Sequence, residues 1–162
     1  MKIGVYPGTF DPITHGHTDI ITRSLRVFDK VIVAVAPNPG KRPLFDVAER
    51  VEMVRIVTKE LVQVEVEAFD GLLVQYVRQR SARAVIRGLR AISDFEHEFQ
   101  MVLINRKLDS AVETVFFMPR EEYSYLTSSI IKEVASLGGA LKDFAHPEVA
   151  KRLRQRLRRH PS

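Results

Sequence analysis

Short apolar runs rich in valine and isoleucine recur along the chain. They alternate with longer segments in which apolar residues return every three or four positions. A short, nearly continuous apolar run is typical of a strand buried on both faces of a parallel sheet, and the longer segments have the period of amphipathic helices. The pattern predicts strands over residues 3–6, 31–36, 64–69, 84–86 and 115–118.

Helices are predicted between and after these strands, and several carry a start or stop signal. The first should follow Gly16, at the end of a polar loop. Asp46 and Glu49 have the spacing of a capping box at the start of the second. Two more are predicted over residues 91–108 and 128–137.

This alternation of strands and helices predicts right-handed crossovers between parallel strands. We therefore expect an α/β fold: a Rossmann-like, doubly wound, parallel five-stranded sheet with helices on both faces, followed by C-terminal helices. The 162 residues fit one compact core, so residues 1–162 are expected to form a single domain. Because ligands bind beyond the carboxyl ends of such strands, the loops at 7–17, 37–42 and 87–90 are the first places to look for a site.

The composition is that of an ordinary globular protein and excludes several kinds of chemistry. Hydrophobic residues make up 45% of the chain and charged residues 28%, close to the averages for folded domains. The absence of cysteine excludes disulfides, thiol catalysis, iron–sulfur clusters and cysteine-ligated zinc, and it suits a cytoplasmic protein. No apolar run is long enough to cross a bilayer or to form a signal peptide, so we expect no membrane association.

The net charge of +5 is concentrated near the C-terminus. Six of the 25 lysines and arginines lie between positions 151 and 162, and the rest of the chain carries one more acidic than basic residue. Val149, Leu153 and Leu157 fall on one stripe of a helix predicted over about residues 147–160. We interpret the tail as a docked helix with a solvated basic face, and keep contact with RNA or a membrane surface as the minority alternative.

The first post-strand loop, residues 7–17, has the features of a phosphate-binding turn. Gly8 and Gly16 permit close approach of the backbone to a ligand, and a helix N-terminus offers unpaired N–H groups and partial positive charge. His17 would be a further donor at this entrance. The loop matches neither the dinucleotide-binding G-x-G-x-x-G nor the P-loop, and a strand-to-helix turn without a ligand would use the same glycines.

Two other patterns suggest chemistry that the rest of the chain does not support. Ser129 and Lys132 fit the S-x-x-K signature of acyl-serine enzymes, but the accompanying S-D-N and K-T-G are missing. His15 and His17 have the spacing of a metal pair in barrel hydrolases, but the chain is too short for that barrel and lacks the later ligands. We assign no residue to a metal.

Residues 14–17, Thr-His-Gly-His, resemble the T/H-x-G-H signature of nucleotidyltransferases, which class I aminoacyl-tRNA synthetases share. His17 matches the second histidine of that motif. The resemblance extends over almost the entire chain to the adenylyltransferases of coenzyme A biosynthesis, through Arg-Gly-Leu-Arg at 87–90, Asp-Phe-Glu at 94–96, Met-Pro at 118–119 and residues 123–129. At 126–129 this chain has Leu-Thr-Ser-Ser where those enzymes usually have Ile-Ser-Ser-Ser.

The resemblance implies reversible transfer of the adenylyl group of ATP to 4′-phosphopantetheine, giving dephospho-coenzyme A and pyrophosphate. The acceptor phosphate is already an anion, with a second pKa near ~6, so no general base is needed. The difficulty is to align two polyanions and neutralise the charge that develops during transfer. Mg²⁺ is expected to enter with ATP, bound mainly by phosphate oxygens and water.

The same resemblance assigns roles to individual residues. His17, Lys41 and Arg90 are expected to be catalytic, with His17 stabilising the pentacoordinate transition state. Thr9, Lys41, Leu73 and Arg87 are expected to bind 4′-phosphopantetheine. The positions expected to bind ATP are Thr9, Phe10, His17, Gly88, Leu89, Arg90, Glu98, Tyr123, Ser124, Tyr125, Leu126, Thr127, Ser128 and Ser129. From the sequence pattern alone, Ser128 and Ser129 are expected to cap the helix that follows them.

The resemblance also implies a homohexamer and feedback inhibition by coenzyme A. The nearest alternative is another nucleotidyltransferase of the same fold, for instance one acting on nicotinamide mononucleotide. A non-catalytic RNA-binding module with a basic tail is the alternative from a different class. The near-neutral charge of the rest of the chain argues against nucleic acid as a partner.

Overall fold

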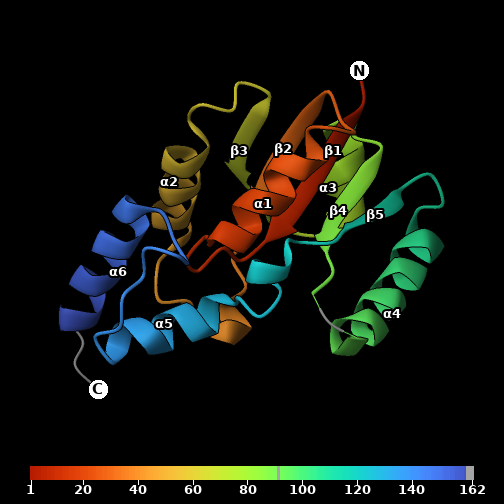
Figure 1. Cartoon of the computed structure of the whole chain (residues 1–162). Coiled ribbons are helices and arrows are strands. Elements are labelled where there is room, and N and C mark those ends of the chain that lie inside the picture. Colours follow the sequence, from red (N-terminus) through yellow and green to blue (C-terminus); the bar gives the residue numbers. More distant parts are fainter. Residues whose placement is uncertain (91, 160–162) are drawn as a thin grey trace.

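The computed structural model describes residues 1–90 and 92–159. Five parallel strands form one sheet in the order β3-β2-β1-β4-β5 (Figure 1). The predicted strands are confirmed, with ends that differ by at most two residues. Their bounds are β1 (Ile3–Gly8), β2 (Lys30–Val35), β3 (Val64–Ala68), β4 (Ala84–Gly88) and β5 (Glu113–Phe117).

The sheet is buried on both faces, and strand β2 shows how. Val31, Val33 and Val35 pack into the core formed with α1 (His15–Ser24) and α2 (Val47–Thr58). Ile32 and Ala34 point the other way, into the core formed with α3 (Leu73–Gln79). Because successive side chains of a strand alternate between faces, one continuous apolar run fills two cores. The expected doubly wound, Rossmann-like fold is therefore confirmed.

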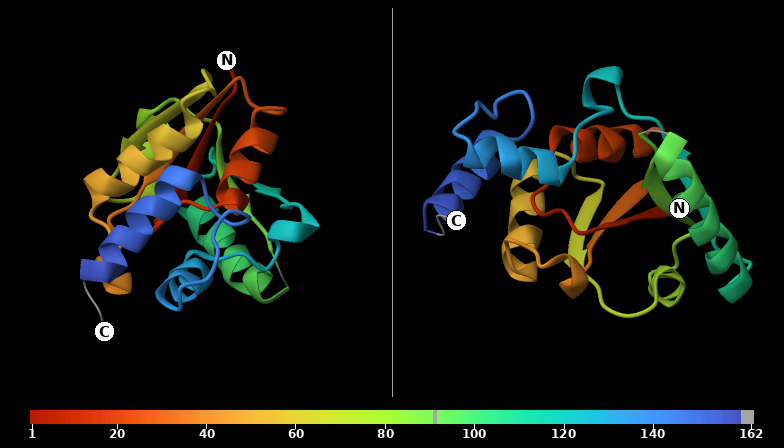
Figure 2. Two further views of the ribbon diagram at one scale, coloured as in Figure 1. Left: turned by 60° about the vertical axis from the view of Figure 1, so that its left-hand side comes forward. Right: turned by 90° about the horizontal axis from the view of Figure 1, so that it is seen from below.

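The remaining helices lie at the two ends of the sheet. Helix α4 (Ile92–Leu108) lies beside the edge strand β5, and the predicted first residue of this helix, Ala91, lies outside the described residues. Helices α5 (Ser128–Ser136) and α6 (Pro147–Arg159) pack together at the opposite end, where α6 also contacts α2 (Figure 2). Within the described ranges, no helix is both long and apolar enough to cross a membrane.

Side-chain caps fix where the first two helices begin. Helix α1 begins at His15 rather than after Gly16, because Thr14 is extended and its hydroxyl accepts the N–H of His17. Helix α2 begins after Asp46, and the predicted capping box with Glu49 is present.

The basic C-terminal helix is docked, as its apolar stripe predicts. Val149 and Leu153 of α6 are fully buried. Its basic face is only partly solvated, because Arg152 forms an ion pair with Glu52 of α2 at 2.9 Å and Arg156 pairs with Glu49. Two arginines of the face expected to be solvated therefore pair with acidic residues of α2, which lie opposite.

Strand β1 is the point where the chain order of the sheet reverses. The chain runs outward from β1 to β2 and β3 on one side, then returns to β4 and β5 on the other. The loops that leave β1 and β4 therefore diverge at their carboxyl ends and open a crevice between the two halves of the sheet.

Candidate active site

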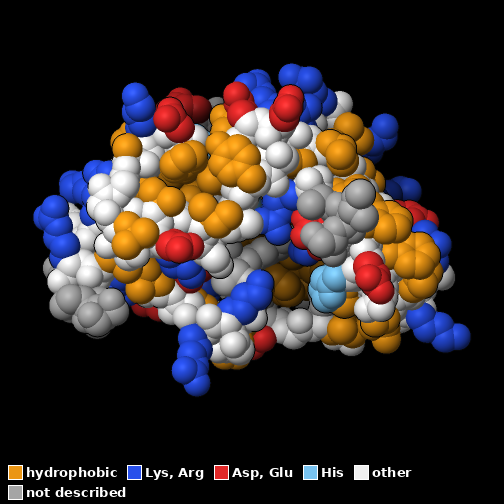
Figure 3. Space-filling view, turned by 60° about the horizontal axis from the view of Figure 1, so that its bottom comes forward, with side chains coloured by type: hydrophobic (Ala, Val, Ile, Leu, Met, Phe, Trp, Pro, Cys, Tyr) orange, Lys and Arg blue, Asp and Glu red, His pale blue; other side chains and the backbone are white. Residues whose placement is uncertain are grey.

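A cleft of about 910 Å³ opens at this reversal point. Its walls come from the loops after β1, β2 and β4, from α4, and from the segment before α5. The space-filling view shows the hollow with basic side chains and a histidine at its margin (Figure 3). The cleft is thus built from the three post-strand loops that the sequence singles out, together with two later segments.

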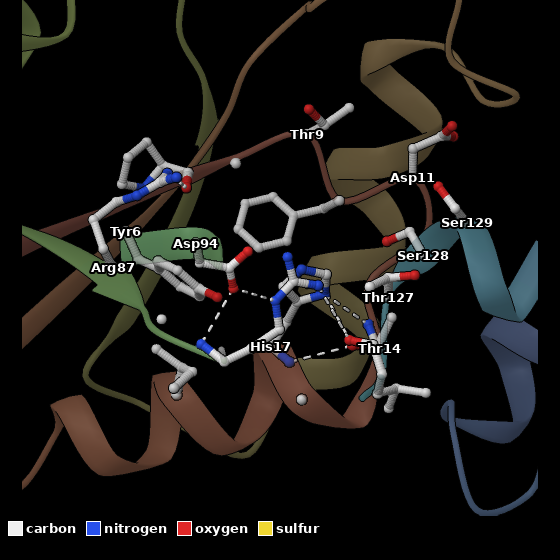
Figure 4. A pocket seen from close by; sticks show the side chains of 18 of the residues that line it. Tyr6, Thr9, Asp11, Thr14, His17, Arg87, Asp94, Thr127, Ser128 and Ser129 are labelled. Atoms are coloured by element: carbon white, nitrogen blue, oxygen red, sulfur yellow. Dashed lines mark hydrogen bonds and ion pairs between the residues drawn. The ribbon is translucent and has the colours of Figure 1, made fainter. Parts of the chain in front are cut away.

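His17 enters the cleft from the first turn of α1, and its ring lies against Thr14 (Figure 4). The Nδ1 atom accepts the main-chain N–H of Thr14 at 3.0 Å, which completes the capping box. Phe10 packs edge-on against the imidazole, with ring centres 5.0 Å apart. Burial, followed by the positive charges of Arg90 and Arg87, lowers the pKa of His17 to about 4. At neutral pH the ring is therefore uncharged, and Nε2 carries the proton as a hydrogen-bond donor.

Two arginines line the cleft next to β4, and each is paired with an acid from α4. The Nε atom of Arg87 donates to Glu98 Oε2 at 3.0 Å. The Nε atom of Arg90 donates to Asp94 Oδ2 at 3.2 Å. These carboxylates hold the guanidinium groups in place, and a phosphate bound by the arginines would compete with them.

The loop after β2 brings a third cation to the cleft. Lys41 ends the short 3₁₀ turn η1 (Pro39–Lys41) and is exposed at the cleft wall. Asn38, which precedes this turn in the left-handed conformation, donates from Nδ2 to Thr9 Oγ1 at 2.8 Å. This bond links the loop after β2 to the loop after β1, so the expected residues Thr9 and Lys41 come together.

The segment before α5 forms another wall of the cleft. Thr127 is the N-cap of α5, because its hydroxyl accepts the N–H of Ile130 at 3.1 Å. Ser128 instead donates from Oγ to the carbonyl oxygen of Pro12 at 2.8 Å, which ties α5 to the first loop. The expectation that Ser128 and Ser129 cap this helix is therefore wrong: the last extended residue is Thr127, one position earlier.

A further ion pair lies at the bottom of the cleft. Lys132 Nζ of α5 is 3.0 Å from Asp11 Oδ2, and both residues line the cleft. The buried Asp11 carboxylate also accepts the main-chain N–H groups of Leu44 and Phe45. The sequence pattern placed Lys132 only in an unsupported S-x-x-K reading and did not single out Asp11.

Comparison with known proteins identifies the family. The model of the cytidylyltransferase-like family matches residues 5–134. The chain is 52% identical to the phosphopantetheine adenylyltransferase of Caldanaerobacter subterraneus subsp. tengcongensis, over 98% of this chain and 99% of that protein. It is 54% identical to the enzyme of the same name from Moorella thermoacetica, over 96% of this chain and 98% of the relative. The chain belongs to the phosphopantetheine adenylyltransferase family.

Solved structures of other nucleotidyltransferases share this family's fold. A protein described as a nicotinate-nucleotide adenylyltransferase from Vibrio parahaemolyticus superposes with a TM-score of 0.71 at 18% identity, covering 94% of this chain and 91% of that chain. A bifunctional protein described as an NMN adenylyltransferase/ADP ribose pyrophosphatase from Francisella tularensis gives the same TM-score at 15% identity, covering 97% of this chain and 50% of that one. At these identities the likeness shows the fold alone.

Most residues expected to form the site of a phosphopantetheine adenylyltransferase lie together in the cleft. Leu89, Ser124 and Tyr125 do not line it. The N–H of Leu89 continues the sheet by donating to the carbonyl oxygen of Phe117 at 3.1 Å, and the Ser124 hydroxyl donates to Glu121. Tyr125 is 58% exposed. The expected residues that line the cleft are Thr9, Phe10, His17, Lys41, Leu73, Arg87, Gly88, Arg90, Glu98, Tyr123, Leu126, Thr127, Ser128 and Ser129.

Proposed function

We propose that the protein transfers the adenylyl group of ATP to 4′-phosphopantetheine in coenzyme A biosynthesis. An oxygen of the acceptor phosphate forms a bond to the α-phosphorus of ATP while the bond from that phosphorus to pyrophosphate breaks. The products are dephospho-coenzyme A and pyrophosphate, and the reaction is reversible. The observation that carries this proposal is identity above one half, over nearly the full length, to enzymes named phosphopantetheine adenylyltransferase.

His17 is proposed to stabilise the transition state without moving a proton. The acceptor phosphate is already an anion, so it needs no general base. Negative charge develops on the oxygens of the α-phosphate during transfer, and a fixed N–H donor next to them lowers the barrier. The bond from Thr14 to Nδ1 leaves Nε2–H as the donor of a neutral ring, which supports this role.

The acceptor is proposed to bind against the loops after β2, β3 and β4. Lys41 and Arg87 would hold its phosphate, Thr9 would contact the reacting centre, and Leu73 would pack against the pantetheine arm. Arg87 can reach a phosphate with two parallel N–H groups once it exchanges Glu98 for the ligand. Two cations and one apolar side chain along this wall fit a substrate with a charged end and a less polar arm.

ATP is proposed to bind on the other side of β1. Arg90 would hold the triphosphate, together with the hydroxyl and N–H groups of Thr127, Ser128 and Ser129 at the start of α5. The rest of the nucleotide would contact the other expected residues that line the cleft, which are Phe10, His17, Gly88, Glu98, Tyr123 and Leu126. The partial positive charge of the α5 N-terminus and the Arg90 guanidinium both favour an anionic ligand there.

Mg²⁺ is proposed to enter bound to ATP. Among the described residues, no group of three or more histidine, aspartate or glutamate side chains could form a metal cage. Mg²⁺ needs few protein ligands, because it keeps several waters and can take its other ligands from the phosphates of ATP. The ion would neutralise charge on the triphosphate, while the protein's own cations hold the acceptor and the triphosphate.

Assembly and regulation are part of the same proposal. Helix α4 exposes several large apolar side chains, and contact with further copies in a homohexamer would bury them. They are Phe95, Phe99, Leu103, Ile104 and Leu108.

We also propose that the enzyme is cytoplasmic and that coenzyme A inhibits it by feedback. Coenzyme A shares the pantetheine arm of the acceptor and can compete for the same cleft.

The proposed reaction is tested by product formation. The purified protein is incubated with Mg·ATP and either 4′-phosphopantetheine, nicotinamide mononucleotide or nicotinate mononucleotide, and pyrophosphate release is measured. The proposal is supported if pyrophosphate is released with 4′-phosphopantetheine and with neither mononucleotide, and if mass spectrometry identifies dephospho-coenzyme A as the other product. Release only with a mononucleotide would replace it with the alternative that shares this fold.

A further inference from the structure

Arg50 of α2 is the largest of the fully buried side chains, with only 1% of its surface exposed. Among residues 1–90 and 92–159, all the hydrogen-bond partners of its guanidinium are main-chain carbonyl oxygens and none is a carboxylate. A buried cation is costly unless hydrogen bonds replace its hydration, and an apolar side chain would fill the same space at lower cost. Packing alone therefore does not account for an arginine here.

The carbonyl groups that Arg50 contacts belong to the two loops that carry Thr9 and Lys41. Its Nη1 atom donates to the carbonyl oxygens of Thr9 at 2.7 Å and of Ala36 at 2.6 Å. The last main-chain hydrogen bond between the ends of β1 and β2 runs from the N–H of Ala36 to the carbonyl oxygen of Gly8, and beyond it Asn38 makes only a side-chain bond to Thr9. Beyond it the two chain segments separate, and Arg50 bridges the gap.

Arg50 contacts both ends of the loop after β2. Its Nη2 atom donates to Pro37 at 3.1 Å and its Nε atom to Phe45 at 3.0 Å. Asp11 reinforces that end by accepting the N–H groups of Leu44 and Phe45. The loop is thus fixed at both ends, while Lys41 projects between them as an exposed side chain on the cleft wall.

On the basis of the proposed function, we infer that Arg50 is a positioning residue for adenylyl transfer. It sets the separation between Thr9, at the reaction centre, and Lys41, which holds the acceptor phosphate. Arg50 does not itself line the cleft. Its planar fork reaches carbonyl groups in several directions at once, whereas a lysine ammonium concentrates its donors at a single point.

The decisive variant is Arg50→Lys, which keeps the charge but loses the bridge. We expect kcat/KM for 4′-phosphopantetheine to fall on the order of 10²-fold, as for a misplaced catalytic group, with much less change in KM for ATP. Arg55→Lys is the matched control. Arg55 lies on the same helix and also donates to a main-chain carbonyl, that of Val66, but this contact lies in β3 and not in the cleft loops. Its kinetics should match those of the wild type.

A double-mutant cycle separates positioning from general stability. If Arg50 acts through Lys41, Lys41→Ala should cost far less in the Arg50→Lys background than in the wild type. The inference is overturned if Lys41→Ala lowers kcat/KM as much in the Arg50→Lys background as in the wild type. It is also overturned if Arg50→Lys impairs the kinetics with ATP as much as those with the acceptor. If Arg50→Lys does not fold, two glycines inserted after Gly40 loosen the loop and leave Arg50 intact; normal acceptor kinetics in that insert would also overturn it.

Hydrogen–deuterium exchange keeps this test independent of the substrate. Residues 37–45 should exchange faster in Arg50→Lys than in the wild type or in Arg55→Lys. Unchanged exchange of this loop would refute the positioning role whatever the enzyme acts on. Conversely, the wild type could be inactive with 4′-phosphopantetheine while Arg50→Lys still exchanges faster in this loop. That result would contradict the proposed function but would support the restraint of the loop by Arg50.

Discussion

The Nδ1 atom of His17 accepts the main-chain N–H of Thr14, three residues earlier in the chain. Because that nitrogen is occupied as an acceptor, the proton of the neutral ring resides on Nε2. The same capping box that starts α1 therefore selects the tautomer that can donate to a phosphate.

His17→Ala should lower turnover and leave nucleotide affinity nearly unchanged. Loss of one transition-state donor costs roughly 2.7–4 kcal/mol, about 10²–10³-fold in kcat. Steady-state kinetics and calorimetric titration with a non-hydrolysable ATP analogue measure the two quantities. His146→Ala, which removes a histidine outside the cleft, is the control. Turnover close to that of the wild type would reject the transition-state role.

The stability of the protein should fall below pH 6.5, and His17 should account for part of this fall. Its folded pKa of about 4 is depressed relative to 6.5 in the unfolded chain, so between these values the unfolded state binds a proton that the folded state does not. The stabilisation is complete above pH 6.5 and is lost as the pH falls toward 4. Urea unfolding at pH 7.5 and pH 5 should show up to about 2 kcal/mol more loss for the wild type than for His17→Asn. Equal losses would mean that His17 titrates normally.

Arg87→Ala should weaken binding of 4′-phosphopantetheine. Charge-assisted hydrogen bonds contribute roughly 1.5–3 kcal/mol each, so the dissociation constant measured by calorimetry should rise more than tenfold. Arg83→Ala is the matched control. Arg83 directly precedes β4, and its side chain is exposed and does not line the cleft. An unchanged affinity of Arg87→Ala for the acceptor would contradict the assignment.

Thr127→Ala should lower the free energy of unfolding by about 1 kcal/mol, because it removes the N-cap of α5. Ser136→Ala, at the other end of the same helix, serves as a comparison for a hydroxyl outside the cap. Urea unfolding followed by circular dichroism gives both values. An equal effect of the two substitutions would argue that the capping bond contributes nothing specific.

Phe99→Glu on the exposed face of α4 should reduce the molecular mass of the assembly. A charge at the centre of a buried apolar contact is costly, so the variant should dissociate to smaller species. Light scattering coupled to gel filtration measures the mass. Val62→Glu is the control, because Val62 is 91% exposed in a turn far from α4 along the chain. An unchanged mass for Phe99→Glu would exclude α4 from the interface.

The parts of this structure that the sequence predicts are those fixed by neighbouring residues. The apolar run of β2 and the capping box at Asp46 are complete within a few positions, and both are confirmed. The sequence places the N-cap of α5 at Ser128 and Ser129, whereas the structure places it at Thr127. All three residues are suitable caps, and the extended backbone angles of Thr127 decide between them.

The contacts that hold the cleft together depend on residues far apart in the chain. Asp11 meets Lys132 across 121 positions, and Arg50 meets Thr9 across 41. No local pattern predicts such pairs. Arg50 nevertheless had a signal: it lies three residues after Val47 and one before Val51, on the side of α2 that should be apolar. A charged residue in that stripe points to a buried polar role.

The reversal of chain order at β1 would place most of the proposed acceptor contacts and most of the proposed nucleotide contacts on separate stretches of polypeptide, with Arg87 of β4 as the exception. Lys41 and Leu73 follow β2 and β3, whereas Arg90 and the α5 N-terminus follow β4 and β5. A change in the arm of the acceptor could therefore be written into one half of the gene, while Arg87 and the proposed nucleotide contacts in the other half stay as they are. A fold divided in this way could accept a different group beyond the shared phosphate by revising the two loops that carry Lys41 and Leu73.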